Sequence, residues 1–191
     1  MIIFQAIYLA FPLILGGLLH ACVLRWNLFS RLAIPLDFGR CCPRGRQIFG
    51  ANKTLRGVVV MTVGAVIGMY LQAHLYAFPA FRQLSLFDYS RVDVLAGGVA
   101  LGLGFTLAEL PNSFLKRRFG IPPGGRGDGM LYWFFLVLDQ VDSVAGCLLA
   151  AALTFWVPDW NVVAAVLAVG IFIHMSVNAC FVAIGIKERV L

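Results

Sequence analysis

The stretch from Met130 to Val157 decides the fold class, and it reads MLYWFFLVLDQVDSVAGCLLAAALTFWV. A helix needs about 20 mainly apolar residues to cross the hydrocarbon core of a bilayer, and this run is longer. Lipid cannot satisfy backbone polar groups, so only helices or closed barrels can span it. The apolar residues are continuous rather than alternating, which disfavours a barrel strand. We therefore expect a membrane-spanning helix over about 130–157.

Four further apolar runs lie on either side of this stretch, at about 2–24, 58–78, 92–110 and 161–186. The composition agrees with five spans: 61% of the residues are hydrophobic, 13% are charged, and the mean hydropathy is +0.88. A soluble domain carries about 25% charged residues, so this composition excludes an ordinary soluble enzyme and a disordered protein. We expect an all-α integral membrane protein with five transmembrane helices in a single domain, 1–191.

The basic residues fall almost entirely on one side of these spans. The loop at about 25–57 holds seven Lys or Arg, the loop at about 111–129 holds four, and the tail holds two, whereas the other side has only Arg82 and Arg91. The positive-inside rule then places both loops and the C-terminus in the cytoplasm and the N-terminus outside. We expect a multi-pass protein of the cell membrane, and the formal charge of +6 indicates topology rather than nucleic-acid binding.

Two carboxylates, Asp139 and Asp142, interrupt the run at 130–157 and share a helix face because they are three residues apart. A charge at the centre of a span costs about 2.5–3.5 kcal/mol on insertion scales, and two carboxylates on one face repel unless a cation lies between them. Mg²⁺ (or Mn²⁺) prefers such oxygen ligands. We expect Asp139 and Asp142 to hold this metal in a polar cleft open to the cytoplasmic side. The alternatives are a proton relay or a salt bridge to Lys116 or Arg118.

The end of the first basic loop has the composition of a phosphate site. A glycine frees the backbone, cations and hydrogen-bonding side chains follow, and a helix N-terminus adds free N–H donors and partial positive charge. The alternative is a plain helix start flanked by membrane anchors. The residues that we expect to bind phosphate here are Asn52, Lys53, Thr54 and Arg56.

The second basic loop combines candidate helix caps with a run of cations. Asn112 and Ser113 follow Pro111 and are natural N-cap residues. The segment around Pro123 and Gly124 is too rich in Pro and Gly for a helix. Three consecutive cations lie between these two parts, namely Lys116, Arg117 and Arg118. Glu109, just before this loop, either joins the site or faces water.

These pieces form an ordered set along the chain. In order they are Gly50-x-Asn52-Lys53-Thr54-x-Arg56-Gly57, Pro111-Asn112-Ser113-Phe114-x-Lys116-Arg117, Pro123-Gly124, Asp139-Gln140-x-Asp142, His174-x3-Asn178 and Gly185-x-Lys187. The set resembles the CDP-archaeol synthase family, a short relative of the phosphatidate cytidylyltransferases. Gln140 stands where the longer cytidylyltransferases have Arg, which favours the archaeol-type branch.

The resemblance implies a magnesium-dependent cytidylyltransferase of phospholipid biosynthesis. It would transfer CMP from CTP to a lipid phosphate, of ether-isoprenoid or phosphatidic acid type, giving CDP-lipid and pyrophosphate. The expected catalytic residues are Asp139, Asp142, Lys116 and Arg117. The expected nucleotide- and phosphate-binding residues are Asn52, Lys53, Thr54, Arg56, Asn112, Ser113, Arg118, Pro123 and Gly124.

A small polytopic transporter or ion-coupled membrane protein is the alternative. It would account for the intramembrane Asp pair equally well, but it would not need the two basic motifs together. Many transporters also show an inverted repeat, which this sequence lacks.

Overall fold

The computed structural model describes residues 1–42, 45–125 and 127–183. Its helices are α1 (Ile2–Arg25), η1 (Ser30–Leu32), α2 (Leu55–Leu75), α3 (Pro79–Arg82), η2 (Tyr89–Arg91), α4 (Val94–Arg118), α5 (Gly129–Thr154) and α6 (Trp160–Ala183). By length and composition α1, α2, α4, α5 and the part of α6 from Trp160 to Val177 are candidate membrane spans. The expectation of an all-α protein with five transmembrane helices is confirmed, while the assignment of sides stays a prediction.

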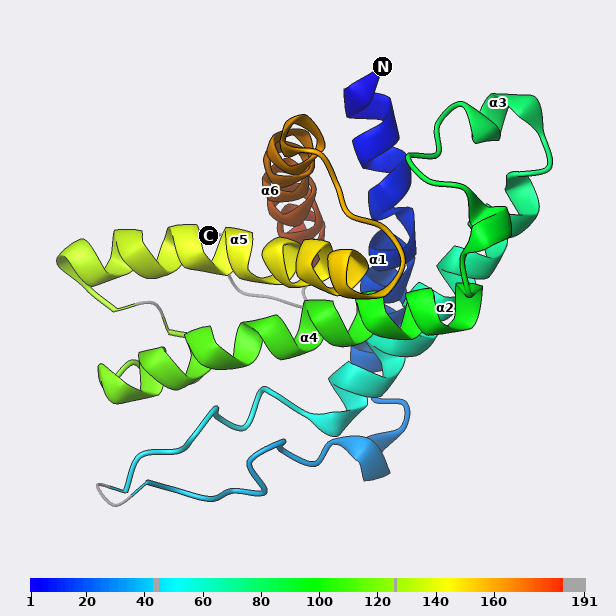
Figure 1. Cartoon of the computed structure of the whole chain (residues 1–191). Helices are drawn as coiled ribbons and strands as arrows, with labels where there is room; N and C mark the ends of the chain where they lie inside the picture. Colours follow the sequence, from blue (N-terminus) through cyan, green and yellow to red (C-terminus); the bar gives the residue numbers. More distant parts are fainter. Residues whose placement is uncertain (43–44, 126, 184–191) are drawn as a thin grey trace.

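The five long helices pack against one another in pairs (Figure 1). Helices α4 and α5 run antiparallel side by side, α2 packs against both α1 and α4, and α6 contacts α1 and α5. The α4–α5 pair comes very close at Gly104 and Gly146, where a Cβ on Gly146 would clash with Ala108 Cβ and the Gly104 carbonyl oxygen. Small residues allow such close approach of helix backbones in membranes. This contact brings the facing side chains of α4 and α5 within hydrogen-bonding reach.

One expectation about the second basic loop is wrong. Residues 111–118 belong to α4, which continues past Pro111 to Arg118, so the connection to α5 begins only at Phe119. Asn112 and Ser113 are not helix caps: both lie within the continuing helix, and both side chains are buried. Prolines are tolerated in transmembrane helices because neighbouring groups satisfy the freed carbonyl. The cations of this segment are therefore held on a rigid element rather than on a flexible loop.

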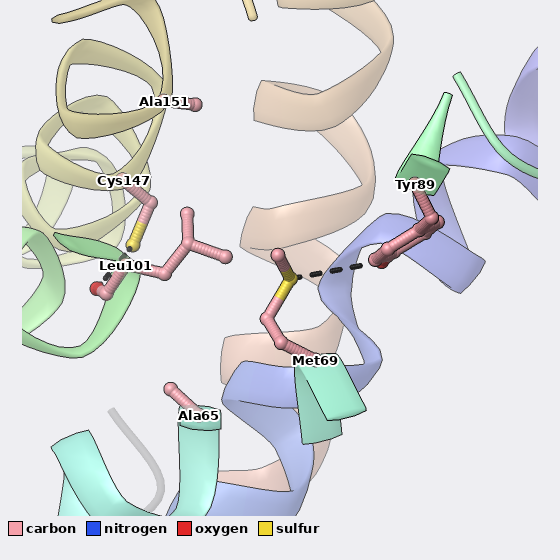
Figure 2. Packing of buried hydrophobic residues seen from close by; sticks show 6 residues of the cluster. All are labelled: Ala65, Met69, Tyr89, Leu101, Cys147 and Ala151. Carbon is pink, nitrogen blue, oxygen red and sulfur yellow. Dashed lines mark hydrogen bonds between the residues drawn. The ribbon is translucent and has the colours of Figure 1, made fainter. Parts of the chain in front are cut away.

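The hydrophobic core joins α2, α4, α5 and the connection between α2 and α4 (Figure 2). The Tyr89 hydroxyl donates to Gln72 Oε1 at 2.7 Å and lies 3.6 Å from Met69 Sδ. Burial raises the pKa of the Tyr89 hydroxyl, so it remains a donor at neutral pH. The cluster consists of Ala65, Met69, Tyr89, Leu101, Cys147 and Ala151.

Some expected features lie outside the described part of the chain. Gly185 and Lys187 belong to the undescribed segment 184–191, and the side chains of His174 and Asn178 are likewise not described. The resemblance at the last helix therefore stays a prediction.

Candidate active site

Two helix faces meet to form a polar cluster inside the apolar bundle. On α4 each polar residue follows the previous one by three or four positions, and on α5 Asp142 and Ser143 lie three and four positions after Asp139, which places each set on one face. Because α4 and α5 are antiparallel, the two faces meet in opposite order along the chain. The cluster comprises Glu109, Asn112 and Lys116 of α4 and Asp139, Asp142 and Ser143 of α5.

Asn112 lies at the centre of this cluster. Its Nδ2 atom donates to Asp139 Oδ1 and to Asp142 Oδ2, each at 2.7 Å. The side chain is almost fully buried, and its Oδ1 atom has no hydrogen-bond partner in the described part of the chain. One amide therefore holds both carboxylates together and leaves an additional oxygen buried in the same place.

Lys116 neutralises one of the two carboxylates. Its Nζ atom lies 2.5 Å from Asp139 Oδ1 and 2.6 Å from Asp139 Oδ2. The same nitrogen is 5.6 Å from the centre of the Phe135 ring, which is fully buried and shields one side of the ammonium from water. The salt bridge to Lys116 that the sequence leaves open is thus present.

Among the described residues, the donors to Asp142 are all uncharged. Its Oδ1 atom accepts from the Ser143 backbone N–H at 2.6 Å. The Ser143 hydroxyl lies 3.2 Å from the same oxygen and 2.9 Å from Glu109 Oε1, so it donates to one of the two at a time.

Glu109 also accepts from Lys53 Nζ, which links the first basic loop to the cluster. Glu109, left unassigned by the sequence, could have been found from its helical spacing to Asn112.

The cluster suits a divalent cation by its chemistry. Three carboxylates face two ammonium groups, and the buried Asn112 oxygen adds a further oxygen atom of the kind that Mg²⁺ prefers as a ligand. Among the described residues, no group of three or more His, Cys, Asp and Glu is arranged as a metal site by itself. Mg²⁺ typically binds one or two protein carboxylates and takes its other ligands from water and substrate phosphates, so Asp139 and Asp142 fit such a site by number.

Arg117 and Arg118 point away from the carboxylates, toward the first basic loop. Arg118 Nη2 donates to the Gln47 carbonyl at 2.7 Å, and the Arg46 guanidinium donates in return to the Arg118 carbonyl. Arg117 is 6% exposed and lines a pocket of about 290 Å³ together with Pro123. Arg46, which the sequence indicated only as one of many cytoplasmic charges, is thereby placed beside the predicted phosphate-binding residues.

The residues expected to cradle phosphate before α2 are only partly brought to the cluster. Lys53 reaches Glu109, whereas Thr54 caps α2 by accepting from the Gly57 N–H at 3.3 Å. Arg56 donates to Asn27 Oδ1 at 3.0 Å and to the Leu28 carbonyl at 3.2 Å. The structure thus gives Thr54 and Arg56 positioning contacts within the first loop.

Three further site predictions concern residues with less defined surroundings. Asn52 is exposed, and Ser113 is buried within α4. Gly124 has a φ of +80°, so it forms a turn that favours glycine. The phosphate-binding roles assigned to them stay predictions.

Asp37 organises the first basic loop, and the motif-based prediction missed it. Its carboxylate is 5% exposed and accepts from the backbone N–H groups of Gly39, Phe49 and Gly50 at 2.9–3.1 Å. Burial acts to raise the pKa of Asp37, but these hydrogen bonds outweigh it and hold the pKa below its usual value. The signal available in the sequence is an Asp followed two residues later by Gly, typical of an Asx turn.

Five long apolar helices, with a partly buried cluster of carboxylates, lysines and an amide between two of them, define an integral membrane protein with a polar site in its helix bundle. A sequence model of the family described as CarS-like: CDP-archaeol synthase matches residues 1–191. The chain belongs to this family, and the resemblance derived from the motifs is confirmed.

Curated relatives cover most of the chain. A protein named CDP-archaeol synthase from Pyrococcus furiosus is 36% identical over 127 residues, which are 66% of this chain and 61% of that protein. The chain thus spans less than two thirds of that relative. Proteins of the same name from Thermofilum pendens and Methanospirillum hungatei are each 30% identical, over 86% and 85% of this chain and 67% and 94% of their own lengths.

A solved structure of an intramembrane enzyme for archaeal membrane lipids biosynthesis supports the fold. It matches with a TM-score of 0.57 and 21% sequence identity, over 89% of this chain and 92% of that one. At this identity the likeness concerns the arrangement of the helices.

Proposed function

We propose that this protein is a membrane-embedded cytidylyltransferase that transfers CMP from CTP to a lipid phosphate, giving CDP-lipid and diphosphate. The observation that carries the proposal is the cluster in which Asn112 holds Asp139 and Asp142 together beside Lys116. Membership of a family described as CDP-archaeol synthase supports this over the transporter alternative. The lipid class that it favours has ether-linked isoprenoid chains.

In the proposed reaction, a phosphate oxygen of the lipid attacks the α-phosphorus of CTP and forms a new P–O bond. The bond from that phosphorus to the bridging oxygen breaks, and the electron pair leaves with diphosphate. Since the lipid phosphate is already an anion, the reaction needs no strong general base. The main task of the protein is to bring two polyanions together and to stabilise charge on the leaving group.

The side chains of the cluster suit this task. Asp139 and Asp142 would hold Mg²⁺ (or Mn²⁺), which when bound neutralises phosphate charge and orients the reacting group. Lys116 and Arg117, adjacent on α4, would contact phosphate oxygens, and Lys53 would do so from the first loop. The lysines are already positioned by carboxylates, which limits the entropy lost when substrate binds.

The cluster is only partly buried, which agrees with a site that receives substrate. The side chains of Lys53, Glu109 and Asp139 are 22–28% exposed, whereas Asn112 is 4% exposed. A lipid could therefore bring its headgroup to the cluster while its chains remain in the bilayer. With the basic loops in the cytoplasm, the site would face that side, where CTP is present.

The proposal is tested with the purified full-length protein in detergent, incubated with labelled CTP, Mg²⁺ and a panel of lipid phosphates. The panel contains dialkyl isoprenoid ether lipids and diacyl phosphatidic acids of matched headgroup. We expect labelled CDP-lipid with at least one member and none when Mg²⁺ and Mn²⁺ are removed by chelation. Absence of product with every lipid would contradict the proposal and favour the transporter.

A further inference from the structure

The first basic loop exposes several large aromatic side chains. Trp26, Phe29 and Phe38 are 67%, 61% and 75% exposed. They belong to the connection between α1 and α2, so they lie outside the candidate membrane spans. A single exposed apolar residue needs no explanation, but several in one segment indicate a site of contact with a protein or a membrane.

The two phenylalanines also have an uncommon backbone conformation. Phe29 and Phe38 each have a φ of +51°, in the left-handed region that bulky residues rarely adopt and that glycine adopts easily. In water each residue would therefore carry two costs, a strained backbone and an exposed ring. An apolar surrounding from outside the chain would remove the second of these costs.

The loop runs out from α1 and back to α2 (Figure 1), and the segment that carries Phe38 is fixed within it. Asp37, next to Phe38, accepts from three backbone N–H groups of the loop. The Leu36 N–H donates to the Lys53 carbonyl at 2.8 Å. The Phe38 ring is thus carried by a defined backbone, and the position of this segment determines that of Lys53, which reaches the carboxylate cluster.

The same segment carries cations without anionic partners. Arg25, at the end of α1, and Arg31 and Arg40, in the loop, are all exposed. Within residues 1–42, 45–125 and 127–183, no carboxylate forms an ion pair with any of the three. Basic residues beside a membrane span are attracted to anionic lipid headgroups, and aromatic rings favour the interface between hydrocarbon and water. One surface, that of an anionic leaflet, would suit both kinds of side chain.

We propose that the segment from Trp26 to Arg40 is an interfacial anchor. It lies in the headgroup layer at the end of α1, with Phe29 and Phe38 inserted shallowly and Arg31 and Arg40 paired with the phosphates of anionic lipids. The segment directly follows a membrane-spanning helix, so the lipid surface is within reach, and this favours lipid over a protein partner. Because the segment is joined to Lys53, the anchor would set the depth of the carboxylate cluster below the headgroups.

The test measures the depth of two reporters, Phe29→Trp and Phe38→Trp, in the full-length protein reconstituted into liposomes. The liposomes contain phosphatidylcholine and phosphatidylglycerol in a fixed ratio, and one of the two lipids has brominated chains, which quench tryptophan at short range. The emission of the unmodified protein, with its four Trp, is subtracted. We expect both reporters to be quenched, and by about twofold or more in favour of brominated phosphatidylglycerol, because the arginines enrich anionic lipid locally.

Three further variants separate the parts of the proposal. Leu153→Trp places a reporter on an exposed apolar position of α5 and should be quenched equally by both brominated lipids. Arg31→Gln combined with Arg40→Gln should abolish the preference for phosphatidylglycerol and leave quenching by phosphatidylcholine in place. Trp26→Phe tests the anchor without a new tryptophan and should remove part of the emission that brominated lipid quenches.

Three results would overturn the anchor. The first is a Phe38→Trp reporter that acrylamide quenches and brominated lipid does not, which would place the loop in water. The second is a reporter shielded from acrylamide and from both lipids, which would assign the segment to a protein contact. The third is equal quenching by the two lipids with both arginines intact, which would exclude selection of anionic lipid. None of these readings depends on CDP-lipid formation.

Discussion

The side chain of Asn112 is small and uncharged, yet its amide nitrogen donates to two carboxylates at once. A cation at this position would neutralise Asp139 and Asp142 permanently, whereas an amide holds them together and preserves their charge. Lys116 then pairs with Asp139, while the donors that the described residues offer Asp142 are uncharged. The local arrangement therefore retains negative charge, as the proposed metal site requires.

Asp139→Asn is the sharpest test of this arrangement. The change keeps the shape of the side chain but removes the charge that Lys116 and a metal ion would use. We expect formation of CDP-lipid to fall by about 10²-fold or more, the range seen when a group that stabilises transition-state charge is removed. The measurement is the rate of CDP-lipid formation at saturating CTP.

Asp159→Asn is the matched control for that variant. Asp159 is exposed and lies directly before α6, away from the cluster, so its loss should leave the rate unchanged. Both variants should elute and unfold as the unmodified protein does. Full activity of a folded Asp139→Asn protein would contradict the metal assignment.

Asp37 predicts a pH dependence of the first basic loop. Its pKa is lowered in the folded protein by three backbone hydrogen bonds. The stabilisation is therefore complete above the unfolded pKa of about 3.9 and is lost as the pH falls through the folded value. We expect hydrogen exchange of residues 47–50, corrected for the intrinsic rate, to accelerate only under acid.

Asp37→Asn should remove this stabilisation at every pH. The variant loses the charge and leaves backbone donors poorly satisfied, at a cost of about 1–3 kcal/mol. Its exchange at residues 47–50 should be fast already at pH 7, with no further step under acid. Protection equal to that of the unmodified protein would show that the loop is held by other contacts.

At the scale of the elements, α4 and α5 act as one unit. Their facing polar residues repeat every three or four positions, and the contact of Gly104 with Gly146 brings the two backbones close. The polar contacts in the cluster join side chains across this interface. Separation of the two helices would therefore disrupt the site even if every polar residue were retained.

Gly146→Ala tests the closeness of this pair. A methyl group at Gly146 would collide with Ala108 and with the Gly104 backbone, so the helices must shift. We expect the free energy of unfolding to fall by about 1–3 kcal/mol, the usual effect of overpacking. The measurement is the unfolding midpoint in detergent.

Gly17→Ala serves as the control, because a Cβ at Gly17 meets nothing within 4 Å. It should unfold at the midpoint of the unmodified protein or slightly above, since Ala favours a helix over Gly. Equal midpoints for the two variants would mean that α4 and α5 can separate slightly without loss.

The sequence predicts the number of spans well, but it predicts the end of α4 poorly. Long apolar runs predict helices because lipid cannot form hydrogen bonds with backbone N–H and C=O groups, which a helix satisfies internally. Around Pro111 the local signals favour a helix break, yet Asn112 and Lys116 are buried against α5 and hold the helix together through side-chain contacts. Such tertiary contacts are not visible in local composition, so the loop prediction was wrong there.

The candidate site, like the fold, could be predicted from the sequence only in part. The spacing of Asp139 and Asp142 indicates their common face, and the structure joins Asn112, Lys116 and Lys53 to them directly or through Glu109. Arg46 was not found, because its position depends on the course of a loop far from α4 in sequence. Local pattern thus predicts residues that share a helix face, but not those brought together by loop packing.

At the scale of the whole molecule, the two basic segments lie close together. Arg46 and Gln47 of the first basic loop lie against the end of α4: the Arg46 guanidinium donates to the Arg118 carbonyl, and Arg118 Nη2 donates to the carbonyls of Arg46 and Gln47. Both basic segments therefore lie at the same end of the helix pair. This common location agrees with the positive-inside prediction.

Labelling of Cys41 would measure directly on which side of the membrane the first basic loop lies. It is an exposed free thiol in the first basic loop. We expect a membrane-impermeant maleimide to leave Cys41 unlabelled in intact cells and to label it once the membrane is permeabilised. Loss of the signal in Cys41→Ser assigns it to Cys41, rather than to the less exposed Cys42 beside it or to Cys22 within α1. Labelling in intact cells would place the basic loops outside and would contradict the predicted topology.

The pocket between Arg46 and Arg117 is lined by two segments that are synthesised at different times. The ribosome delivers Arg46 first, and α2 and nearly all of α4 must then be synthesised and inserted before Arg117 and Pro123 emerge. During that interval the arginines of the first loop have no opposite wall. The pocket is thus completed only late in synthesis, and a chain interrupted before residue 117 would carry the first basic loop without it.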